Sequence, residues 1–139
     1  MAVTRNATAH WNGSLVEGSG QVTLDSSGIG TFPITWAARS EAPGGLTSPE
    51  EFIAAAHASC FSMALSSGLS KAGSPPTSLD TAVEVDFQPG QGITGIRITV
   101  SGVVPGLDAD GFAKAAQEAK EGCPVSKALS AVPISLSVQ

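Results

Sequence analysis

Short alternating runs of hydrophobic and polar residues occupy the first third of the chain. Three such runs, at residues 8–11, 20–25 and 32–38, are separated by Gly, Asn and Ser residues that favour turns. Alternation with a period of two is typical of strands that present one face to a core. The pattern therefore predicts a three-stranded meander at the N-terminus.

A long helix is predicted after a Gly- and Pro-rich loop. Ser48 is a favourable N-cap, Pro49 suits the first helical position, and Glu51 completes a capping box. We predict that the helix covers residues 49–72, because Gly73 and the prolines that follow it stop helix propagation.

The middle of this helix has no charged face. Residues 53–65 are apolar or small on nearly every side of the helix. A helix of this kind is buried or sandwiched between other elements. Because a chain of 139 residues has a high surface-to-volume ratio, a partner subunit is the expected cover.

The second half of the chain predicts a hairpin, two helices and a closing strand. Alternation places every second residue of 96–100 on one face of the second hairpin strand. Asp108 or Asp110 is the expected N-cap of the first helix. The expected elements are strands at residues 81–87 and 95–104, helices from about 108 to 122 and at 124–131, and a strand at 134–138. With the first half, they indicate an α+β fold in one domain over residues 1–139.

Charge and hydropathy narrow the classes of partner. The chain carries 7 Lys and Arg residues against 12 Asp and Glu residues, which argues against a basic nucleic-acid surface and against docking on anionic lipid. Residues 1–10 hold no long apolar run of the signal-peptide kind, and the longest apolar stretch, residues 52–65, is shorter than a membrane span. We therefore expect a soluble cytoplasmic protein that binds neither nucleic acid nor membrane.

The chain has two cysteines, Cys60 and Cys123. In a reducing cytosol, two lone cysteines are more often redox-active, metal-binding or buried than joined as a structural disulfide. A metal site is not expected, because only His10 and His57 accompany the cysteines, without the spacing of zinc ligands. No C-x-x-C motif is present, which excludes a thioredoxin-like motif, and no cofactor is expected.

Each cysteine has two interpretations. Cys60 lies in the apolar middle of the long helix, where a buried thiol is usually inert. A reactive thiol there needs a nearby cation or hydrogen-bond donors that hold it as thiolate. Cys123 lies in a Gly-Cys-Pro junction at the expected start of a helix, where backbone N–H groups favour an anionic sulfur. Otherwise Cys123 is simply a small loop residue.

His57 and Arg39 also have two interpretations each. His57 precedes Cys60 by about one helical turn, and it is either a base for the thiol or a core residue with a satisfied hydrogen bond. The core interpretation is favoured, because no partner that would orient the imidazole is visible in the sequence. Arg39 follows the third expected strand, and its default partner is Glu41 on the surface.

Two cysteine-containing segments carry a resemblance to a known family. The segment SPEEFIAAAHASCFSMAL, at residues 48–65, closely resembles the osmotically inducible protein and organic hydroperoxide resistance family. The segment EGCPVSKAL, at residues 121–129, is the second match. AHWNG at residues 9–13 and VPGLDA at residues 104–109 are similar to the osmotically inducible branch, so the resemblance covers nearly the whole chain.

The resemblance implies a thiol peroxidase that reduces organic hydroperoxides. By motif, Cys60 is the peroxidatic residue that becomes a sulfenic acid, and Cys123 is the resolving residue that condenses with it to a disulfide. Arg39 matches the arginine that stabilises the thiolate, and Glu50 matches the carboxylate that orients this arginine. An external dithiol, such as a lipoylated protein, is the implied reductant.

Helix geometry points independently to a dimer. Glu50 and Cys60 lie about 15 Å apart along a straight helix that rises 1.5 Å per residue, so one chain alone hardly brings their side chains into one site unless a long arginine side chain spans the gap. Two chains can contribute complementary parts of a site. The resemblance likewise implies an intertwined homodimer with two sites at the subunit interface.

The substrate and the alternative functions depend on the surroundings of Cys60. Phe61, Met63 and the neighbouring alanines are expected to form an apolar pocket, which suits an organic hydroperoxide better than hydrogen peroxide. The alternative function is a non-catalytic dimer that binds apolar ligands or senses redox state. A third interpretation is a structural stress protein in which Cys60 only fills the core.

Overall fold

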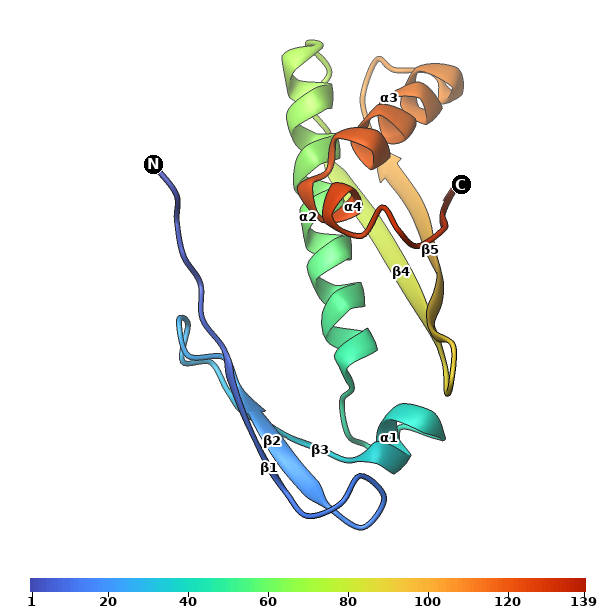
Figure 1. The fold of residues 1–139 in the computed structure, drawn as a ribbon. Helices are drawn as coiled ribbons and strands as arrows, with labels where there is room; N and C mark the ends of the chain where they lie inside the picture. Colours follow the sequence, from blue (N-terminus) through green and yellow to red (C-terminus); the bar gives the residue numbers. More distant parts are fainter. The chain divides into compact units, whose positions relative to one another are not determined.

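The computed structural model describes residues 1–139 as two small sheets and four helices (Figure 1). The strands are β1 (Thr8–Asn12), β2 (Ser19–Thr23), β3 (Thr31–Ile34), β4 (Ser78–Gln88), β5 (Gly92–Val103) and β6 (Ile134–Val138). The helices are α1 (Trp36–Ser40), α2 (Pro49–Lys71), α3 (Ala109–Gly122) and α4 (Pro124–Ala128). The expected α+β class is confirmed.

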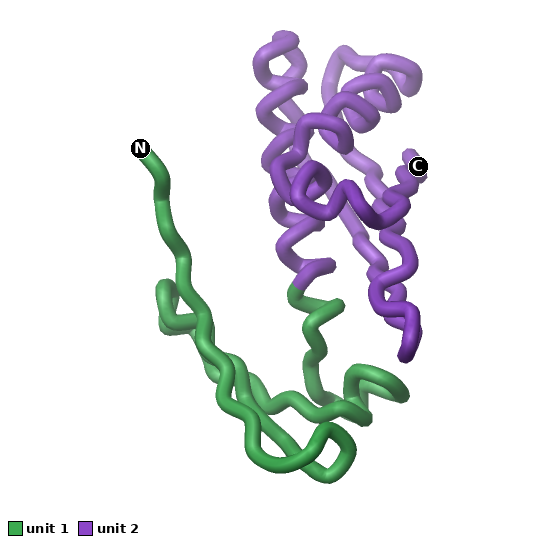
Figure 2. The backbone as a smooth tube through the Cα atoms, viewed as in Figure 1, with its two compact units in different colours: residues 1–52 green, residues 53–139 purple.

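The chain divides into two compact units, residues 1–52 and residues 53–139 (Figure 2). The boundary falls inside α2, so the first turn of this helix belongs to the first unit and the remainder to the second. The expectation of one domain over residues 1–139 stays a prediction.

The first unit is built on the antiparallel meander β1–β2–β3 that the sequence predicts. The third strand is shorter than expected, because the chain leaves the sheet after Ile34 and turns into α1. Thr35 caps this helix: its hydroxyl accepts a hydrogen bond from Ala38 N at 3.1 Å. The prediction of strand through residue 38 was therefore wrong, and Arg39 lies on a helix.

The ends of α2 follow the signals in the sequence. At the start, the Ser48 hydroxyl accepts a hydrogen bond from Glu51 N at 3.2 Å. The Glu51 carboxylate does not complete the reciprocal half of the capping box; it accepts from the Thr47 hydroxyl at 3.1 Å. At the other end, Gly73 takes a φ of 87° and Ser74 N donates to Leu69 O at 2.9 Å, which closes the helix.

By length and composition alone, α2 is the one helix that is long and apolar enough to cross a membrane. An 18-residue window of this 23-residue helix has a mean hydropathy of 1.4, because the helix extends beyond the apolar stretch of residues 52–65 at both ends. The criterion is weak, because the core helix of a soluble protein also meets it. Only 22% of its most apolar part is buried inside the chain.

The second unit holds the sheet β4–β5–β6, in which β5 pairs antiparallel with β4 and parallel with β6. The helices α3 and α4 form the crossover that a parallel pair requires. Ile96, Ile98 and Val100 are all buried, as the alternation predicts. The loop entering α3 is closed by Asp108, whose carboxylate accepts from Gly111 N at 2.7 Å.

The crossover differs from the prediction in one element. α4 ends at Ala128, although the sequence suggested a helix to residue 131. Val132 N donates to Leu129 O at 3.0 Å in a turn that leads into Pro133. This turn takes the place of the last expected helical residues, and Val132, which precedes Pro133, is itself disfavoured in helical conformation.

One hydrophobic cluster joins α2, α3 and the sheet of the second unit. From α2 it contains Phe61, Leu65 and Leu69, which recur every four residues and therefore lie on one side of the helix. The other buried members are Ile98, Val100, Phe112, Ala116, Ala119 and Cys123. A polar link accompanies this packing, since the Ser62 hydroxyl donates to Thr81 Oγ1 at 2.8 Å between α2 and β4.

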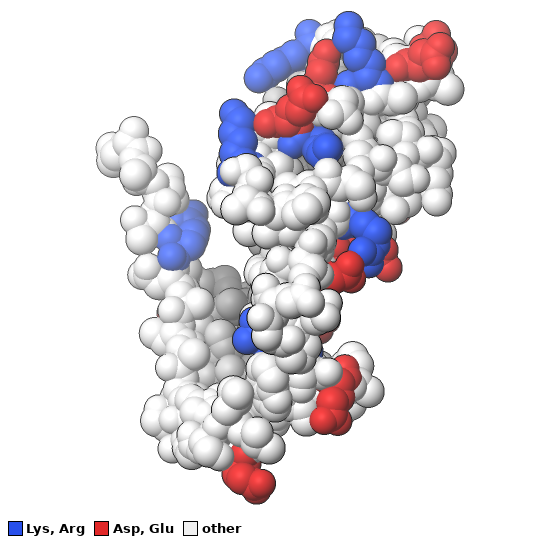
Figure 3. All heavy atoms as spheres, turned by 45° about the vertical axis from the view of Figure 1, so that its right-hand side comes forward, with Lys and Arg blue, Asp and Glu red and all other residues white.

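Lysine, arginine and acidic side chains are interspersed on the face of the molecule drawn in Figure 3. No basic stripe is visible on that face. The chain as a whole is acidic, with a net charge of −5.

His57 is a buried imidazole in the second unit. It is fully buried on α2, and its Nε2 forms a 2.7 Å hydrogen bond with the hydroxyl of Ser126 on α4. Burial lowers the pKa of His57, because desolvation disfavours the charged imidazolium. The favoured interpretation of His57 as a hydrogen-bonded core residue matches this placement.

We predict that this buried imidazole makes the protein less stable in mild acid. The pKa of His57 in the folded state lies below its ordinary value of 6.5, so the unfolded chain binds the proton first as the pH falls. The contribution of His57 is therefore complete above about pH 6.5 and is lost as the pH falls toward the folded-state pKa. Urea midpoints measured between about pH 7.5 and 5 are expected to fall more steeply for the wild type than for His57→Gln.

His10→Gln is the matched control for this experiment, because His10 lies exposed on β1. It is expected to keep the wild-type dependence on pH. Equal slopes for the wild type and His57→Gln would contradict the prediction.

Candidate functional site

The structure brings Cys60 and Cys123 together within the second unit. Both are free thiols, and they lie close enough for each to shift the pKa of the other. Cys60 is half-buried on α2 and packs against the hydrophobic cluster of which Cys123 is a fully buried member. Two residues that are far apart in the sequence thus form one dithiol pair.

The backbone at the junction of α3 and α4 holds Cys123 in place. Its N–H donates to Ala119 O at 2.8 Å, and its carbonyl accepts from Lys127 N at 3.0 Å. Cys123 therefore ends one helix and begins the next. The N–H groups that follow it at the start of α4 have no partner within the helix, so they are free to point at the sulfur.

The surroundings shift the two thiols in opposite directions. Burial raises the pKa of Cys60; a hydrogen bond from the backbone of Val125 opposes this shift, whereas the contact with Cys123 adds to it. Burial also acts on Cys123, but hydrogen bonds from the backbone N–H of Ser126, the Cys60 thiol and the Ser126 hydroxyl outweigh it and lower the pKa of Cys123. Between the two sulfurs, Cys123 is the better site for a negative charge.

The raised pKa of Cys60 has a direct chemical meaning. Only the thiolate is a nucleophile, and no cation is among the groups that shift the Cys60 thiol. A reactive Cys60 therefore requires a positive charge in addition to the hydrogen bonds that the second unit supplies.

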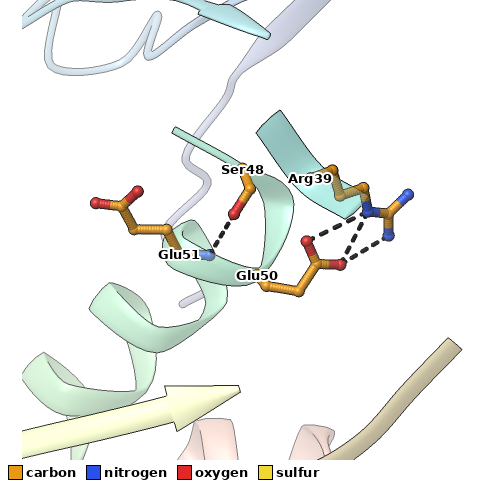
Figure 4. A network of polar contacts seen from close by, with 4 residues as sticks. All are labelled: Arg39, Ser48, Glu50 and Glu51. Atoms are coloured by element: carbon orange, nitrogen blue, oxygen red, sulfur yellow. Dashed lines mark hydrogen bonds and ion pairs between the residues drawn. The ribbon is translucent and has the colours of Figure 1, made fainter. Parts of the chain in front are cut away.

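The first unit contains an oriented cation, Arg39. Its guanidinium forms a fork-like pair with Glu50: Nη2 lies 2.8 Å and Nε 3.0 Å from Oε1, and Nε lies 3.2 Å from Oε2 (Figure 4). The Glu50 side chain is 8% exposed and that of Arg39 is 32% exposed. Such a bidentate contact fixes the plane of the guanidinium as well as neutralising the carboxylate.

The partner of Arg39 is thus Glu50 and not Glu41, the default expected from the sequence. Local structure explains the difference. The unexpected helix α1 carries Arg39, and Glu50 lies in the first turn of α2, as drawn in Figure 4. Glu41 is exposed at the end of α1.

Ser126 is the polar residue of this region that the sequence analysis missed. It is 7% exposed, it contacts His57, and it contributes two of the hydrogen bonds that lower the pKa of Cys123. The sequence signal was its place in the first turn after Cys123, where a side chain faces back toward the cap. His57 is bonded to Ser126 and not to Cys60, so the structure gives no support to His57 as the base for Cys60.

The expected apolar pocket of Phe61 and Met63 is not present in the chain. Phe61 is fully buried in the cluster, whereas Met63 is 71% exposed. Two residues on a helix lie roughly on opposite sides when they are two positions apart, so they do not line one pocket.

The structure has a groove between α2 and α3; neither cysteine is among its lining residues, and the charged side chains of Lys71, Lys114 and Glu118 line it in part. It has a volume of about 490 Å³. Its lining is mainly small and apolar, with Ala64, Leu69, Leu107, Ala115, Ala119 and Gly122 among its residues. Ala64 lies one turn after Cys60, and Gly122 directly precedes Cys123. No group of three or more His, Cys, Asp and Glu side chains is placed to hold a metal ion.

Proteins of known sequence are similar to this chain over most of its length. The chain is 43% identical over 134 residues to Peroxiredoxin OsmC of Escherichia coli K12, with 94% of this chain and 93% of that protein covered. Peroxiredoxin OsmC of Shigella flexneri matches to the same extent.

Solved structures share the fold. The organic hydroperoxide resistance protein OsmC of Legionella pneumophila matches with a TM-score of 0.77 at 24% identity, over 100% of this chain and 98% of that one. The organic hydroperoxide resistance protein OhrB of Bacillus subtilis matches with a TM-score of 0.72 at 26% identity, over 99% and 98%. The family described as OsmC-like protein matches residues 42–137, which include both cysteines. On its sequence and on its fold, this chain belongs to the OsmC family.

Proposed function

We propose that this protein is a cysteine-based peroxidase that reduces organic hydroperoxides to alcohols. The single observation that carries the proposal is the dithiol pair Cys60–Cys123, in a chain 43% identical to proteins named peroxiredoxin. A thiol that is oxidised to a sulfenic acid is rescued by a second thiol close enough to form a disulfide with it.

In the proposed reaction, the Cys60 thiolate attacks the distal oxygen of the hydroperoxide. The O–O bond breaks, the alkoxide takes up a proton to become the alcohol, and Cys60 is left as a sulfenic acid. The Cys123 sulfur then forms the Cys60–Cys123 disulfide and the sulfenic oxygen leaves as water. A dithiol reductant restores both thiols by exchange, and a lipoylated protein is the class that the family resemblance implies.

Arg39 and Glu50 have the proposed roles of cation and orienting carboxylate. The Cys60 thiol needs a positive charge to ionise, since its pKa is raised by its own surroundings. The resemblance assigns Arg39 to this charge. The bidentate contact with Glu50 supports the assignment, because it holds the guanidinium in one orientation.

We further propose that the hydroperoxide carries an apolar organic group. The groove between α2 and α3 is lined mainly by small and apolar residues, two of which, Ala64 and Gly122, are close in sequence to the two cysteines, and its volume of about 490 Å³ has room for such a group. The same groove is also compatible with a second function. In this alternative, the protein is a non-catalytic dimer that binds apolar ligands or senses redox state through the two cysteines.

The proposed functional form is a homodimer. In the single chain, α2 buries one side in the core, while Met63 on another side is 71% exposed. Other large apolar side chains are also exposed, including Leu15, Val16 and Ile29 of the first unit. Only 22% of the most apolar part of α2 is buried inside the chain, and an exposed apolar helix face supports an interaction site there. The resemblance names the occupant as a second copy of this chain.

We predict that one equivalent of cumene hydroperoxide consumes both thiols of the reduced protein. The expected product of the wild type is a disulfide, two hydrogen atoms lighter than the reduced chain. Cys60→Ser is expected not to react, and Cys123→Ser is expected to accumulate overoxidised Cys60 because no resolving thiol is present. Thiol titration and intact mass measure all three.

The same assay with hydrogen peroxide tests the substrate class. A higher kcat/KM for hydrogen peroxide than for cumene hydroperoxide would refute the organic substrate. A wild type that keeps both thiols through many equivalents of either peroxide rules out the enzyme and favours the ligand-binding alternative.

Arg39→Lys is predicted to slow the first step by about 10- to 100-fold, since lysine keeps the charge and loses the bidentate geometry. The measurement is the rate of Cys60 oxidation in a single turnover. Arg97→Lys is the matched control, because Arg97 pairs with Glu84 and Asp86 on the exposed face of β4 and β5. Equal rates for the two variants would remove Arg39 from the mechanism.

The homodimer is tested by molar mass in solution at low micromolar concentration. We predict a dimer for the wild type and a weakened dimer for Met63→Glu, because a charge is costly to bury in an apolar interface. Val103→Glu is the control at another exposed apolar residue, which is 58% exposed at the end of β5. A wild type that is entirely monomeric contradicts the proposal.

A further inference from the structure

The buried pair His57–Ser126 has a place beside the resolving thiol. The two residues are 0% and 7% exposed, and Nε2 of His57 lies 2.7 Å from the Ser126 hydroxyl. Ser126 lies in the first turn of α4, three residues after Cys123, and its backbone N–H and hydroxyl are both among the groups that lower the pKa of Cys123. A chain of contacts therefore runs from α2 through α4 to the sulfur of Cys123.

The unpaired nitrogen of His57 indicates which groups donate and which accept along this series of contacts. Nδ1 of His57 is buried and has no hydrogen-bond partner. A buried N–H without a partner is rarer than a buried acceptor without one, so Nδ1 is assigned as the unprotonated nitrogen. Nε2 then carries the proton and donates to the Ser126 oxygen. The single hydroxyl hydrogen of Ser126 is left to point at Cys123.

We propose that His57 and Ser126 are positioning residues that hold the Cys123 sulfur as a thiolate, which accepts a hydrogen bond from the Ser126 hydroxyl, ready for its attack on the Cys60 sulfenic acid. The proposal rests on the proposed peroxidase function and adds two residues to its second step. In that step, the lone pair of the Cys123 thiolate forms the S–S bond and the S–O bond of Cys60 breaks. The hydroxide that leaves Cys60 takes up one proton and becomes water. This proton balances the one that Cys123 lost when it became a thiolate.

The electrostatic surroundings of Cys123 agree with this geometry. Burial opposes its ionisation, yet the hydrogen bonds from Ser126, Cys60 and Val125 together lower the pKa of Cys123. No charged side chain contributes to the lowered pKa of Cys123. The groups of α2 near it are Cys60 and His57, whereas Glu121 of α3 and Lys127 of α4 are exposed. Because burial lowers the pKa of His57, the donor stays neutral and its protonated Nε2 is available at neutral pH.

The test compares a hydroxyl group with a methyl group at position 126. In a Cys60→Ser background, Ser126→Thr keeps the hydroxyl, and Ser126→Val replaces it by a methyl group of nearly the same shape. The thiolate absorbance of Cys123 is followed against pH, which needs no peroxidase activity. We expect a midpoint about one pH unit or more higher for Ser126→Val than for Ser126→Thr.

A second pair tests the donor on α2. His57→Gln offers an amide N–H in place of Nε2–H and is expected to stay near the wild-type midpoint, whereas His57→Leu is expected to raise it. With the natural Cys60 present, Ser126→Val and His57→Leu are also expected to raise the fraction of Cys60 overoxidised per turnover, because the sulfenic acid waits longer for resolution.

The outcomes separate this inference from the proposed function. Coincident titrations for the Thr and Val variants, with equal overoxidation, overturn the roles of His57 and Ser126 even if the wild type reduces hydroperoxides. A wild type that leaves hydroperoxide untouched overturns the peroxidase, whatever the titrations of Cys123 show. Circular dichroism of each variant identifies loss of fold. If a Ser126 variant does not fold, the comparison of His57→Gln with His57→Leu decides whether the inference holds.

Discussion

The contact of one side of α2 with the core of the second unit is the constraint on which the dithiol pair depends. Phe61, Leu65 and Leu69 recur every four residues and are almost completely buried, so they fix the rotation of the helix about its axis. Cys60 directly precedes Phe61 and is therefore held at the edge of the cluster. Cys123 enters the same cluster from the other end of the chain, at the corner between α3 and α4.

Burial alone would keep both thiols protonated and inert. The groups that oppose this effect differ between the two sulfurs. Around Cys123 the opposing groups are local, because backbone and hydroxyl donors of α4 lie within one turn of the residue and favour its thiolate. Around Cys60 the local donors are insufficient, and its pKa stays raised. This asymmetry gives a physical reason for a separate, oriented guanidinium such as the one that Glu50 holds on Arg39.

The apolar character of α2 serves two purposes in this account. One side supplies the core, and the remaining apolar side chains are left for a second copy of the chain in the proposed dimer. That composition also explains why α2 resembles a membrane span by length and hydropathy. Its buried side is bound to a sheet through Phe61 and Leu65 and through the hydroxyl contact of Ser62, which is typical of a core helix.

The sequence by itself determined much of the fold, because most of its signals are local. Ser48 and Asp108 were recognised as helix caps, and alternation located the buried side of β5 at residues 96–100. It also supplied the two cysteines and, through the resemblance, the pairing of Arg39 with Glu50. Local signals were too weak where they competed, so the strand through residue 38 and the helix through residue 131 were wrong.

Only the tertiary structure decided the chemistry of the individual groups. The hydrogen bond between His57 and Ser126 joins residues on two helices that are far apart in the chain, and nothing local to either residue announces it. The opposite pKa directions of Cys60 and Cys123 likewise depend on burial and on donors that reach each sulfur through space. Helix rotation sent Phe61 into the core and Met63 to the surface, although the sequence shows them as near neighbours. Residue types and local propensities are properties of the chain, whereas desolvation and hydrogen bonding between distant residues exist only once the chain has packed.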